Sequence, residues 1–376
     1  PDGVYSTAFV EADQSISDNY YKSDALVADG TISNGALMLR FAHRMTNAYI
    51  TFNEDVTDVT ILNQSLNTSA VTGSSSIKAY KVDAWTWRAC IVPGQTQLKV
   101  TGKKGGRGFE VVFNVDDNLQ EGTLYTFRVI YFTDSTGKVL WDLSTGPLVI
   151  NNDRTYYVTQ SSGVTGNGIT VRNGAPTIYI DGLNVSADIA LNIENGNPTV
   201  RVVNSNTLKS TGFGASGIQV GDYLTSGSIK IVGSGTLTAI GGDQGCGIGA
   251  IYNSTGGWHI NIEDCTVIAQ ANGADPAGIG ARGGGAQCGN ITIKNAMITS
   301  TGTAGGAGIG SGVGGKCGNI TITLKQGDTK EEFLGRMKGY TKVGAGNGNA
   351  QCGTVTWHES VSYTHLRAHE TSAHLV

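Results

Sequence analysis

One glycine-rich phrase is repeated three times between residues 240 and 322, and it constrains the fold of this chain more than any other feature. The triplet GIG begins at Gly247, Gly278 and Gly308, in steps of 31 and 30 residues. A fixed period of this length indicates a repeat architecture. Each copy holds short β-prone runs joined by glycine, with no helical spacing of apolar residues. This pattern predicts a β-solenoid whose coils stack through parallel strand pairing.

Within each repeat, apolar and polar residues alternate along the strand-like runs. Successive side chains on a strand point to opposite faces, so Ile291 and Ile293 face one way and their polar neighbours face the other. Every repeat has the same phase, which predicts an interior ladder of isoleucines and a polar exterior. The middle residues of the GIG triplets, Ile248, Ile279 and Ile309, fit a second inward-facing strand.

The period extends beyond these three copies. Gly217 precedes Gly247 by 30 residues, and weaker repeats begin near Gly168. Terminal coils of a solenoid are expected to be atypical. The segment 325–340 interrupts the period and is predicted to be a short helix or an inserted loop, because it is richer in Lys, Glu and Leu. A last repeat at 350–357 returns to register.

Three of the six cysteines precede the same strand in successive repeats. Cys288, Cys317 and Cys352 would stack roughly 4.8 Å apart on neighbouring coils. Two interpretations stay open: an interior ladder of free thiols that act as small apolar groups, or a bridge between neighbours, since disulfide Cα separations overlap that spacing. No zinc site is expected, because the chain has no C-x-x-C pair or interleaved histidine.

Residues 36–150 differ from the repeats. Short β-prone runs alternate there with turns rich in Asn, Asp, Ser and Gly, which is typical of an antiparallel β-sandwich. A polar junction at 151–165 is expected to precede the repeats. The strand candidates are 37–43, 48–52, 59–62, 77–82, 87–92, 97–100, 109–115, 124–132 and 148–150.

Three phrases in this segment match strand motifs of a known family. They are LRFAHRM at 39–45, WRACIVP at 87–93 and GTLYTF at 122–127. Through them and through the segment 13–26, residues 8–150 resemble the fimbrillin-like proteins of the Bacteroidales, which build or decorate cell-surface pili. The chain departs from the family at Gly94, which separates the preceding proline from the glutamine that usually follows it. The resemblance covers one domain of the family and the tail of a preceding one.

The repeats carry a second resemblance. The phrase AGIGARGGGAQCGNITI at 277–293 is similar to the repeats of right-handed β-helix modules described as carbohydrate-binding-like in gut bacteria and clostridia. The similarity covers about 168–357. It implies a secreted or surface protein of pectate-lyase-like shape.

Together these patterns predict an all-β chain with an antiparallel β-sandwich followed by a right-handed parallel β-helix. The expected division is a remnant of a preceding fimbrillin-like domain at 1–35, the sandwich at 36–150, the β-helix of about 30-residue coils at 151–358, and a non-native or disordered tail at 359–376. The tail resembles translated sequencing-adaptor read-through, so its histidines are not taken as metal ligands despite their H-x-x-x-H spacing.

Composition bears on the partners that this chain can have. The formal net charge is −4 and the isoelectric point is near 5.9, which gives no electrostatic reason to expect nucleic acid or an anionic membrane. No run of about 18 apolar residues is present, so no transmembrane helix is expected. Because the chain begins with Pro1, we expect a fragment or a processed form whose export signal lies outside this sequence.

The acidic residues of the repeats are scattered, which argues against catalysis. Glycoside hydrolysis needs two carboxylates about 5 to 9.5 Å apart across one bond. Glu263 and Asp264 are adjacent and would point to opposite faces of a regular strand. Arg172, Arg201 and Arg282 fall in different coils with no acidic cluster in phase, unlike a calcium-assisted lyase. The sequence therefore predicts no catalytic residue, cofactor or metal.

A binding surface has more support. The first strong repeat carries a longer corner with Tyr252 and Asn253, and Trp258 and His259 follow it. Aromatic faces and amides suit sugar rings, which offer C–H surfaces and hydroxyl groups, so these four residues and Arg282 are the candidate ligand contacts. A structural alternative stays open, because Trp258 shares strand parity with the interior isoleucines and His259 aligns with the asparagines of an outer ladder.

The sequence thus predicts a non-enzymatic adhesin or fimbria-associated protein that binds glycans or another host-surface ligand through its β-helix. The sandwich would connect it to fimbrial subunits or to the cell envelope. We expect an extracellular location, at the cell surface or anchored to the outer membrane. Two alternatives remain: a structural pilus component whose helix is a rigid spacer, and a polysaccharide lyase or hydrolase that acts on the helix.

Overall fold

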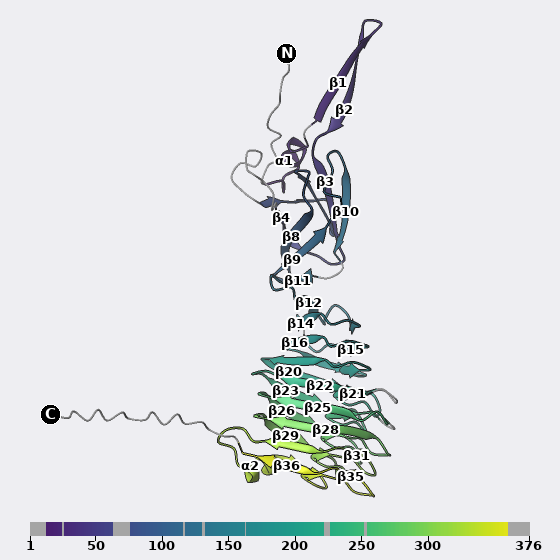
Figure 1. The fold of residues 1–376 in the computed structure, drawn as a ribbon, viewed down its shortest axis with the longest axis vertical. Helices are drawn as coiled ribbons and strands as arrows, with labels where there is room; N and C mark the ends of the chain where they lie inside the picture. Colours follow the sequence, from purple (N-terminus) through teal and green to yellow (C-terminus); the bar gives the residue numbers. More distant parts are fainter. Residues whose placement is uncertain are drawn as a thin grey trace, which may run out of the picture. The chain divides into compact units, whose positions relative to one another are not determined.

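The computed structural model describes residues 13–24, 26–62, 76–115, 117–129, 132–161, 163–221, 226–251 and 254–359. It divides the chain into two compact units, Pro1–Leu140 and Trp141–Val376, and each is described by itself (Figure 1). The predicted all-β class is confirmed: the α-helices of the described residues are α1 (Ser17–Lys22) and α2 (Lys330–Gly335). Neither has the length and apolarity needed to cross a membrane. The predicted tail lies outside the described residues from 360 onward.

Two sheets face each other in the first unit, as the sandwich prediction requires. One has the order β10-β3-β7-β6 and the other β11-β9-β8-β4-β5. Their pairs are antiparallel, except that β10 runs parallel to β3. The strands are β3 (Thr46–Phe52), β4 (Thr57–Leu62), β5 (Ser76–Lys78), β6 (Tyr80–Lys81), β7 (Thr86–Ile91), β8 (Gln97–Lys104), β9 (Arg107–Asn114), β10 (Leu124–Val129) and β11 (Phe132–Thr133), with β12 (Val139–Asp142) paired to β11.

Aromatic side chains fill the core between these sheets. Phe52 of β3, Phe109 of β9 and Phe132 of β11 are buried, and their ring centroids lie 5.0 to 5.9 Å apart. These rings bury large apolar surfaces and pack edge-on or offset, as aromatic groups prefer. The core therefore depends on residues that are far apart in the sequence.

The segment 13–24 belongs to the sandwich, so the prediction of a remnant domain at 1–35 is wrong for these residues. The buried side-chain amide of Gln14 pairs with β7 as a strand would: its Nε2 donates to the Cys90 carbonyl, and its Oε1 accepts from the Cys90 N–H, both at 2.9 Å. Tyr20 of α1 is buried in the same core and donates to Asn47 Oδ1 at 2.6 Å. The segment thus fills hydrogen bonds of β7 that would otherwise be unsatisfied.

A separate two-stranded sheet follows α1. It consists of β1 (Leu26–Ser33) and β2 (Ala36–His43), which pair antiparallel along their full length. All sixteen strand residues are exposed. The predicted boundary between residues 35 and 36 falls inside the turn of this hairpin, where Asn34 and Gly35 have φ of 51° and 78°. The positive φ suits a tight hairpin turn, so the hairpin is one element rather than a junction between domains.

The second unit is a parallel β-helix with three sheets, which confirms the predicted solenoid (Figure 1). Sheet I holds β14 (Thr155–Thr159), β16 (Thr177–Asp181), β19 (Thr199–Val203), β22 (Ser228–Val232), β25 (Trp258–Glu263), β28 (Gln287–Lys294), β31 (Lys316–Cys317), β32 (Ile320–Thr323), β35 (Gln351–Cys352) and β36 (Val355–His358). Sheet II holds β13 (Leu148–Ile150), β15 (Ile169–Val171), β18 (Leu191–Ile193), β21 (Ile218–Val220), β24 (Ile248–Ala250), β27 (Ile279–Gly280), β30 (Ile309–Gly310) and β34 (Val343–Gly344). Sheet III holds β17 (Asn184–Ala187), β20 (Ser205–Ser210), β23 (Thr236–Ile240), β26 (Thr266–Gln270), β29 (Met297–Thr301) and β33 (Met337–Lys338).

Isoleucines form the interior ladder that the alternation predicts. In sheet I, Ile229 pairs with Ile260, Ile260 with Ile291 and Ile291 with Ile320, and all four are fully buried. In sheet II the three GIG isoleucines stack in the same way. Each coil covers the apolar face of its neighbour, so burial of these side chains, rather than any single contact, stabilises the stack.

The first coils of the helix are shorter than the later ones, and the helix begins earlier in the chain than predicted. Tyr157 pairs with Tyr179 and Tyr179 with Arg201, so the first coils span 22 residues. Ile229 to Ile260 is a coil of 31. β13 pairs in parallel with β15 and therefore belongs to the helix. The prediction that placed 148–150 in the sandwich and 151–165 in a junction is wrong, because these short coils lack the glycine-rich corners by which the longer ones are recognised.

The cysteines of the repeats stack as predicted, and two of them are bridged. Cys288 pairs in register with Cys317, and Cys317 with Cys352. A disulfide joins Cys317 to Cys352, whose Cα atoms are 4.5 Å apart, and Cys288 is a buried free thiol. The alternative of three free thiols is thereby excluded. The bridge fastens the last described coil to the one before it.

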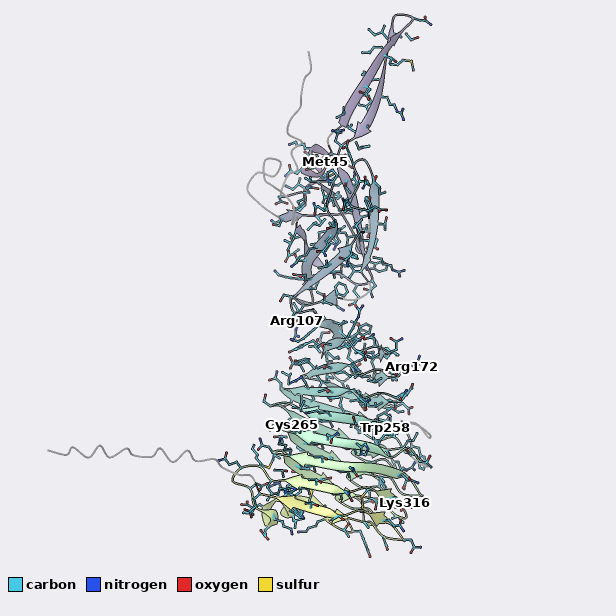
Figure 2. The ribbon with its side chains drawn as sticks, in the orientation of Figure 1. Met45, Arg107, Arg172, Trp258, Cys265 and Lys316 are labelled. Carbon is cyan, nitrogen blue, oxygen red and sulfur yellow. A yellow bond between two sulfur atoms is a disulfide. The ribbon has the colours of Figure 1, made fainter. Side chains whose placement is uncertain are left out.

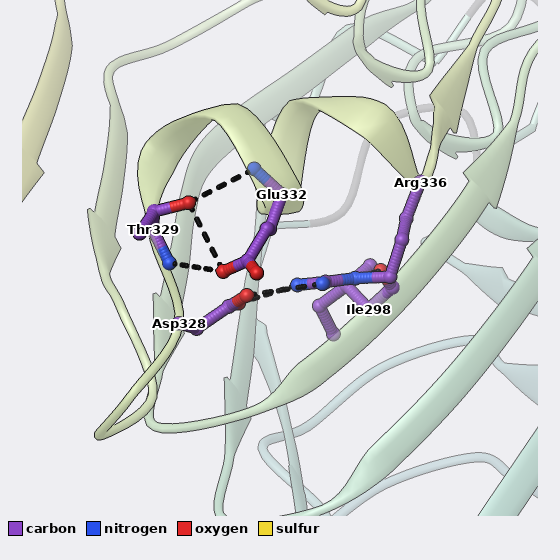
Figure 3. A network of polar contacts seen from close by, with 5 residues as sticks. All are labelled: Ile298, Asp328, Thr329, Glu332 and Arg336. Atoms are coloured by element: carbon purple, nitrogen blue, oxygen red, sulfur yellow. Dashed lines mark hydrogen bonds and ion pairs between the residues drawn. The ribbon is translucent and has the colours of Figure 1, made fainter.

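The interruption at 325–340 contains α2, which confirms the helical alternative (Figure 3). Thr329 caps the helix: its Oγ1 accepts from the Glu332 N–H at 3.2 Å, and the Glu332 carboxylate accepts from the Thr329 N–H at 2.9 Å. This reciprocal pair satisfies two N–H groups that a helix start leaves open. The Arg336 guanidinium donates two hydrogen bonds to the Asp328 carboxylate. Its Nε donates to the Ile298 carbonyl at 3.0 Å, which attaches the insertion to β29.

Candidate ligand-binding site

Trp258 lies in the interior of the β-helix, which corrects its prediction as a surface contact. It is fully buried at the start of β25 (Figure 2). A Cβ on Gly221 or Gly227 of the preceding coil would collide with the indole ring. The two glycines therefore make the room that this large ring needs. Trp258 packs the core and presents no face to a ligand.

His259 is exposed, and it belongs to a ladder of side chains that cap the next coil. Its Nδ1 accepts a hydrogen bond from the Asn290 N–H at 2.9 Å. Asn290 Oδ1 accepts from the Asn319 N–H, and Asn319 Oδ1 from the Thr354 N–H, both at 3.0 Å. The proposed alignment of His259 with these asparagines is confirmed. Each member of the ladder satisfies a backbone donor at the point where the strand pairing of sheet I is interrupted.

Arg282 is buried at a corner of the helix. Its guanidinium carbon lies 5.3 Å from the ring of Phe213, and a Cβ on Gly214 would collide with the guanidinium. Only 8% of Arg282 is exposed, so its side chain ties coils together rather than facing solvent. Tyr252 and Asn253, the other two predicted contacts, lie outside the described residues. Of the three predicted contacts that the structure describes, only His259 is exposed, so these three do not form one open site.

The outer face of sheet I carries a second polar cluster, on the short coils. Tyr157 and Tyr179 stack with centroids 5.9 Å apart, and Arg201 lies 5.6 Å from the ring of Tyr179. Tyr157 donates to Asp181 at 2.6 Å, and Asn204 Nδ2 donates to the other oxygen of the same carboxylate at 2.7 Å. These groups satisfy one another, so the cluster is explained by stacking of coils without a ligand.

A hollow of about 550 Å³ lies where sheet III turns toward sheet II. Its lining includes a column of three residues in register on successive coils: Lys209 next to the last residue of β20, Ile240 at the end of β23 and Gln270 at the end of β26. The half-buried Ile240 lies between the two polar side chains. The lining consists of Lys209, Ser210, Thr211, Ile240, Gly241, Gly242, Asp243, Gln270, Ala271 and Asn272.

Three polar groups of this hollow are unpaired within the described part of the chain. The Lys209 ammonium, the Asp243 carboxylate and the Gln270 amide are exposed, and no side-chain hydrogen bond or ion pair to a described residue engages them. They differ in this from the tyrosine cluster of sheet I. Together they offer a cationic donor, an anionic acceptor and a group that does both. A ligand rich in hydroxyl groups can use all three, with Ile240 under its C–H surface.

The acidic groups of the hollow bear on the chemistry that it could support. Asp243 is the one carboxylate among its described lining residues, whereas hydrolysis of a glycosidic bond uses two. No group of three or more potential metal ligands occurs in the described ranges. The volume falls within the range of small-molecule sites, but the lining is mostly polar, with Ile240 as its one large apolar side chain.

Sequence reasoning missed this site. Lys209 and Gln270 close the third strand of their coils, and a period near 30 residues would have placed them in one column with Ile240. The repeat period alone therefore predicts that these three residues are neighbours. Unlike aromatic residues or paired acids, Lys, Asp and Gln at strand ends do not mark a ligand site in a sequence, because they are ordinary solvent-facing residues elsewhere.

No protein-family model matches this chain, and no curated protein does. Among solved structures, a fimbrial protein from Bacteroides ovatus is similar to it with 15% sequence identity and a TM-score of 0.24. The match covers 33% of this chain and 29% of the Bacteroides protein.

Proposed function

We propose that this protein is a non-catalytic binding protein of the cell surface that holds a glycan in the hollow of its β-helix. The observation that carries the proposal is the column of Lys209, Ile240 and Gln270, with Asp243 beside it. Its unpaired donors and acceptors around an apolar centre suit a sugar ring. The rigid stack of coils holds them in place without the ordering cost that a mobile loop would incur on binding.

The place of the protein in the cell is part of the same proposal. The disulfide between Cys317 and Cys352 supports a location outside the cytoplasm, because structural disulfides persist in oxidising compartments. The fimbrillin-like motifs of the first unit support attachment to a pilus or to the cell envelope. We propose that the sandwich makes this attachment and that the β-helix meets the ligand.

Binding of the full chain to a glycan array tests the function, and variants of the hollow test the site. Lys209→Ala and Gln270→Ala each remove an unpaired group, and loss of one hydrogen bond to a sugar costs about 1 to 2 kcal/mol. We expect affinity for the best glycan to fall about fivefold to thirtyfold in each. Lys338→Ala is the matched control, since Lys338 continues the same column on sheet III outside the hollow.

Two results would contradict the proposal. If the array shows no binding while circular dichroism shows an intact β-structure, the helix acts as a spacer instead. If the bound glycan is cleaved, as release of reducing ends would reveal, the protein is an enzyme. Equal losses in Lys209→Ala and Lys338→Ala would leave glycan binding standing and move the site away from the hollow.

A further inference from the structure

Three cysteines stand in one column of the β-helix, and only the second and the third are joined. The parallel register sets Cys288 opposite Cys317, and Cys317 opposite Cys352, on three successive coils. The disulfide joins Cys317 to Cys352, and Cys288, on the coil before Cys317, is a free thiol. Because the strand spacing is the same at both steps, about 4.8 Å, the geometry that permits the existing bridge also permits one between Cys288 and Cys317.

We propose that the disulfide is movable and that Cys288 can displace Cys352 from Cys317, which makes Cys352 a latent modification site. The exchange is balanced within the chain. Cys288 releases its proton to solvent and its sulfur bonds to that of Cys317, while the bond from Cys317 to Cys352 breaks. Cys352 leaves as a thiolate and takes up a proton. The number of disulfides is unchanged, so no oxidant or reductant is consumed.

The order of the column favours this exchange. The register places Cys317 between its two neighbours, so Cys288 and Cys352 lie on opposite sides of it. Attack by the Cys288 thiolate on the Cys317 sulfur from its own side makes the Cys352 sulfur the leaving group. Cys352 is the suitable leaving group because it is half-buried, whereas only 4% of Cys288 is exposed. The negative charge is thereby released where water can solvate it.

Two features hold the exchange in check. The Cys288 thiol donates to the Trp258 carbonyl at 3.3 Å, toward the preceding coil, and must turn away from it to attack. Burial, with the neighbouring Cys246, raises the pKa of Cys288 above the ordinary value, so little thiolate is present at neutral pH. Uncatalysed rearrangement already takes minutes to hours, and these features place the exchange at the slow end.

The consequence lies at the last described coil. β35 and β36 carry Cys352 and the half-buried Val355 and Trp357. In the observed pairing the bridge fastens this coil to its neighbour. After exchange the coil keeps its strand pairing and its contacts with Asn319 and Phe333. Its free thiol is then open to alkylation, oxidation or a mixed disulfide with another thiol. The interior bridge would then sit one coil deeper in the stack.

Peptide mapping of the alkylated full chain tests the proposal. After incubation between pH 7 and 9, we expect peptides linked through Cys288 and Cys317, and alkylation at Cys352, in equal amounts. Their rate of appearance should rise about tenfold per pH unit, because the thiolate of Cys288 is the attacking group and its pKa lies above this range. In Cys288→Ser only the bridge of Cys317 to Cys352 should be found at every pH.

Cys352→Ser provides a second test. With oxidised glutathione as the oxidant, this variant should form the bridge between Cys288 and Cys317, and circular dichroism reports whether it has folded. Should the variant not fold, mapping of the unsubstituted chain decides alone. The proposal is overturned if no Cys288–Cys317 peptide is found in the folded chain after prolonged incubation at pH 9, or if the alkylation of Cys352 is unchanged in Cys288→Ser.

Discussion

The two units of this chain use apolar side chains in different ways. The sandwich packs single aromatic rings from distant strands: Phe52, Phe109 and Phe132 meet at one point. The β-helix stacks isoleucine on isoleucine in successive coils, as with Ile260 and Ile291, and its interior holds one fully buried indole. In the sandwich each core residue has a unique environment, whereas in the helix each has equivalents one coil away.

This difference predicts how far the loss of stability from a single mutation extends through each unit. A coil of a solenoid contacts only its neighbours, so damage to one coil is shared with the next and fades beyond it. A sandwich core is one cluster, and its members lose contacts together. We therefore expect mutations in the sandwich to act on the whole unit and mutations in the helix to act over a few coils. Hydrogen exchange, which reports local opening, can distinguish these behaviours.

The largest effect is expected for Phe132→Ala. Phe132 is 2% exposed and contacts both other rings of the cluster. Removing a buried phenylalanine costs about 3 to 5 kcal/mol, a large part of the stability of a typical domain. Amide protection should fall throughout the described strands of the first unit and stay unchanged from β16 onward. Loss confined to β11 would contradict the view of the sandwich as one cooperative cluster.

A smaller and more local effect is expected for Gly245→Ala. A Cβ at this position would collide with the carbonyl oxygen of Ala215, one coil away. Overpacking of this kind costs about 1 to 3 kcal/mol, and protection should fall most in β21 and β24 and less with each further coil. Gly146→Ala is the control, since no atom lies within 4 Å of its Cβ position. Equal loss along the whole helix would show that the coils do not behave as separate units.

The repeats made much of the helix predictable. A period near 30 residues and the alternation of NITIK were enough to place Ile291 and Ile320 in one ladder and Asn290 and Asn319 outside it. The weaker repeats were recognised from Gly168, but the first coil was missed because β14 has no GIG triplet and its coil has only 22 residues. In the sandwich, the strands were visible but their order was not, since the parallel pair β10–β3 depends on contacts that no local pattern encodes.

The candidate site was less predictable than the fold. Strand parity already placed Trp258 with the interior isoleucines, yet its burial also needs Gly221 and Gly227 of another coil. The hollow is lined by the ends of three strands and by the corners that follow them. A repeat in the sequence predicts the register of the strands. It does not predict a hollow beside them, because the path of the glycine-rich corners cannot be read from individual residues.

The smallest effect is expected at the outer ladder, and it sharpens the comparison because one position can be changed without touching the core. His259→Ala removes the acceptor of the Asn290 N–H, and an exposed hydrogen bond of this kind is worth about 1 kcal/mol. His259→Asn should restore most of it, because Asn290 already performs the same task for Asn319. We expect amide exchange at Asn290 to quicken in the first variant and return toward its original rate in the second. If both variants exchange alike, the ladder contributes nothing that water does not supply, and the helix is stabilised by its interior alone.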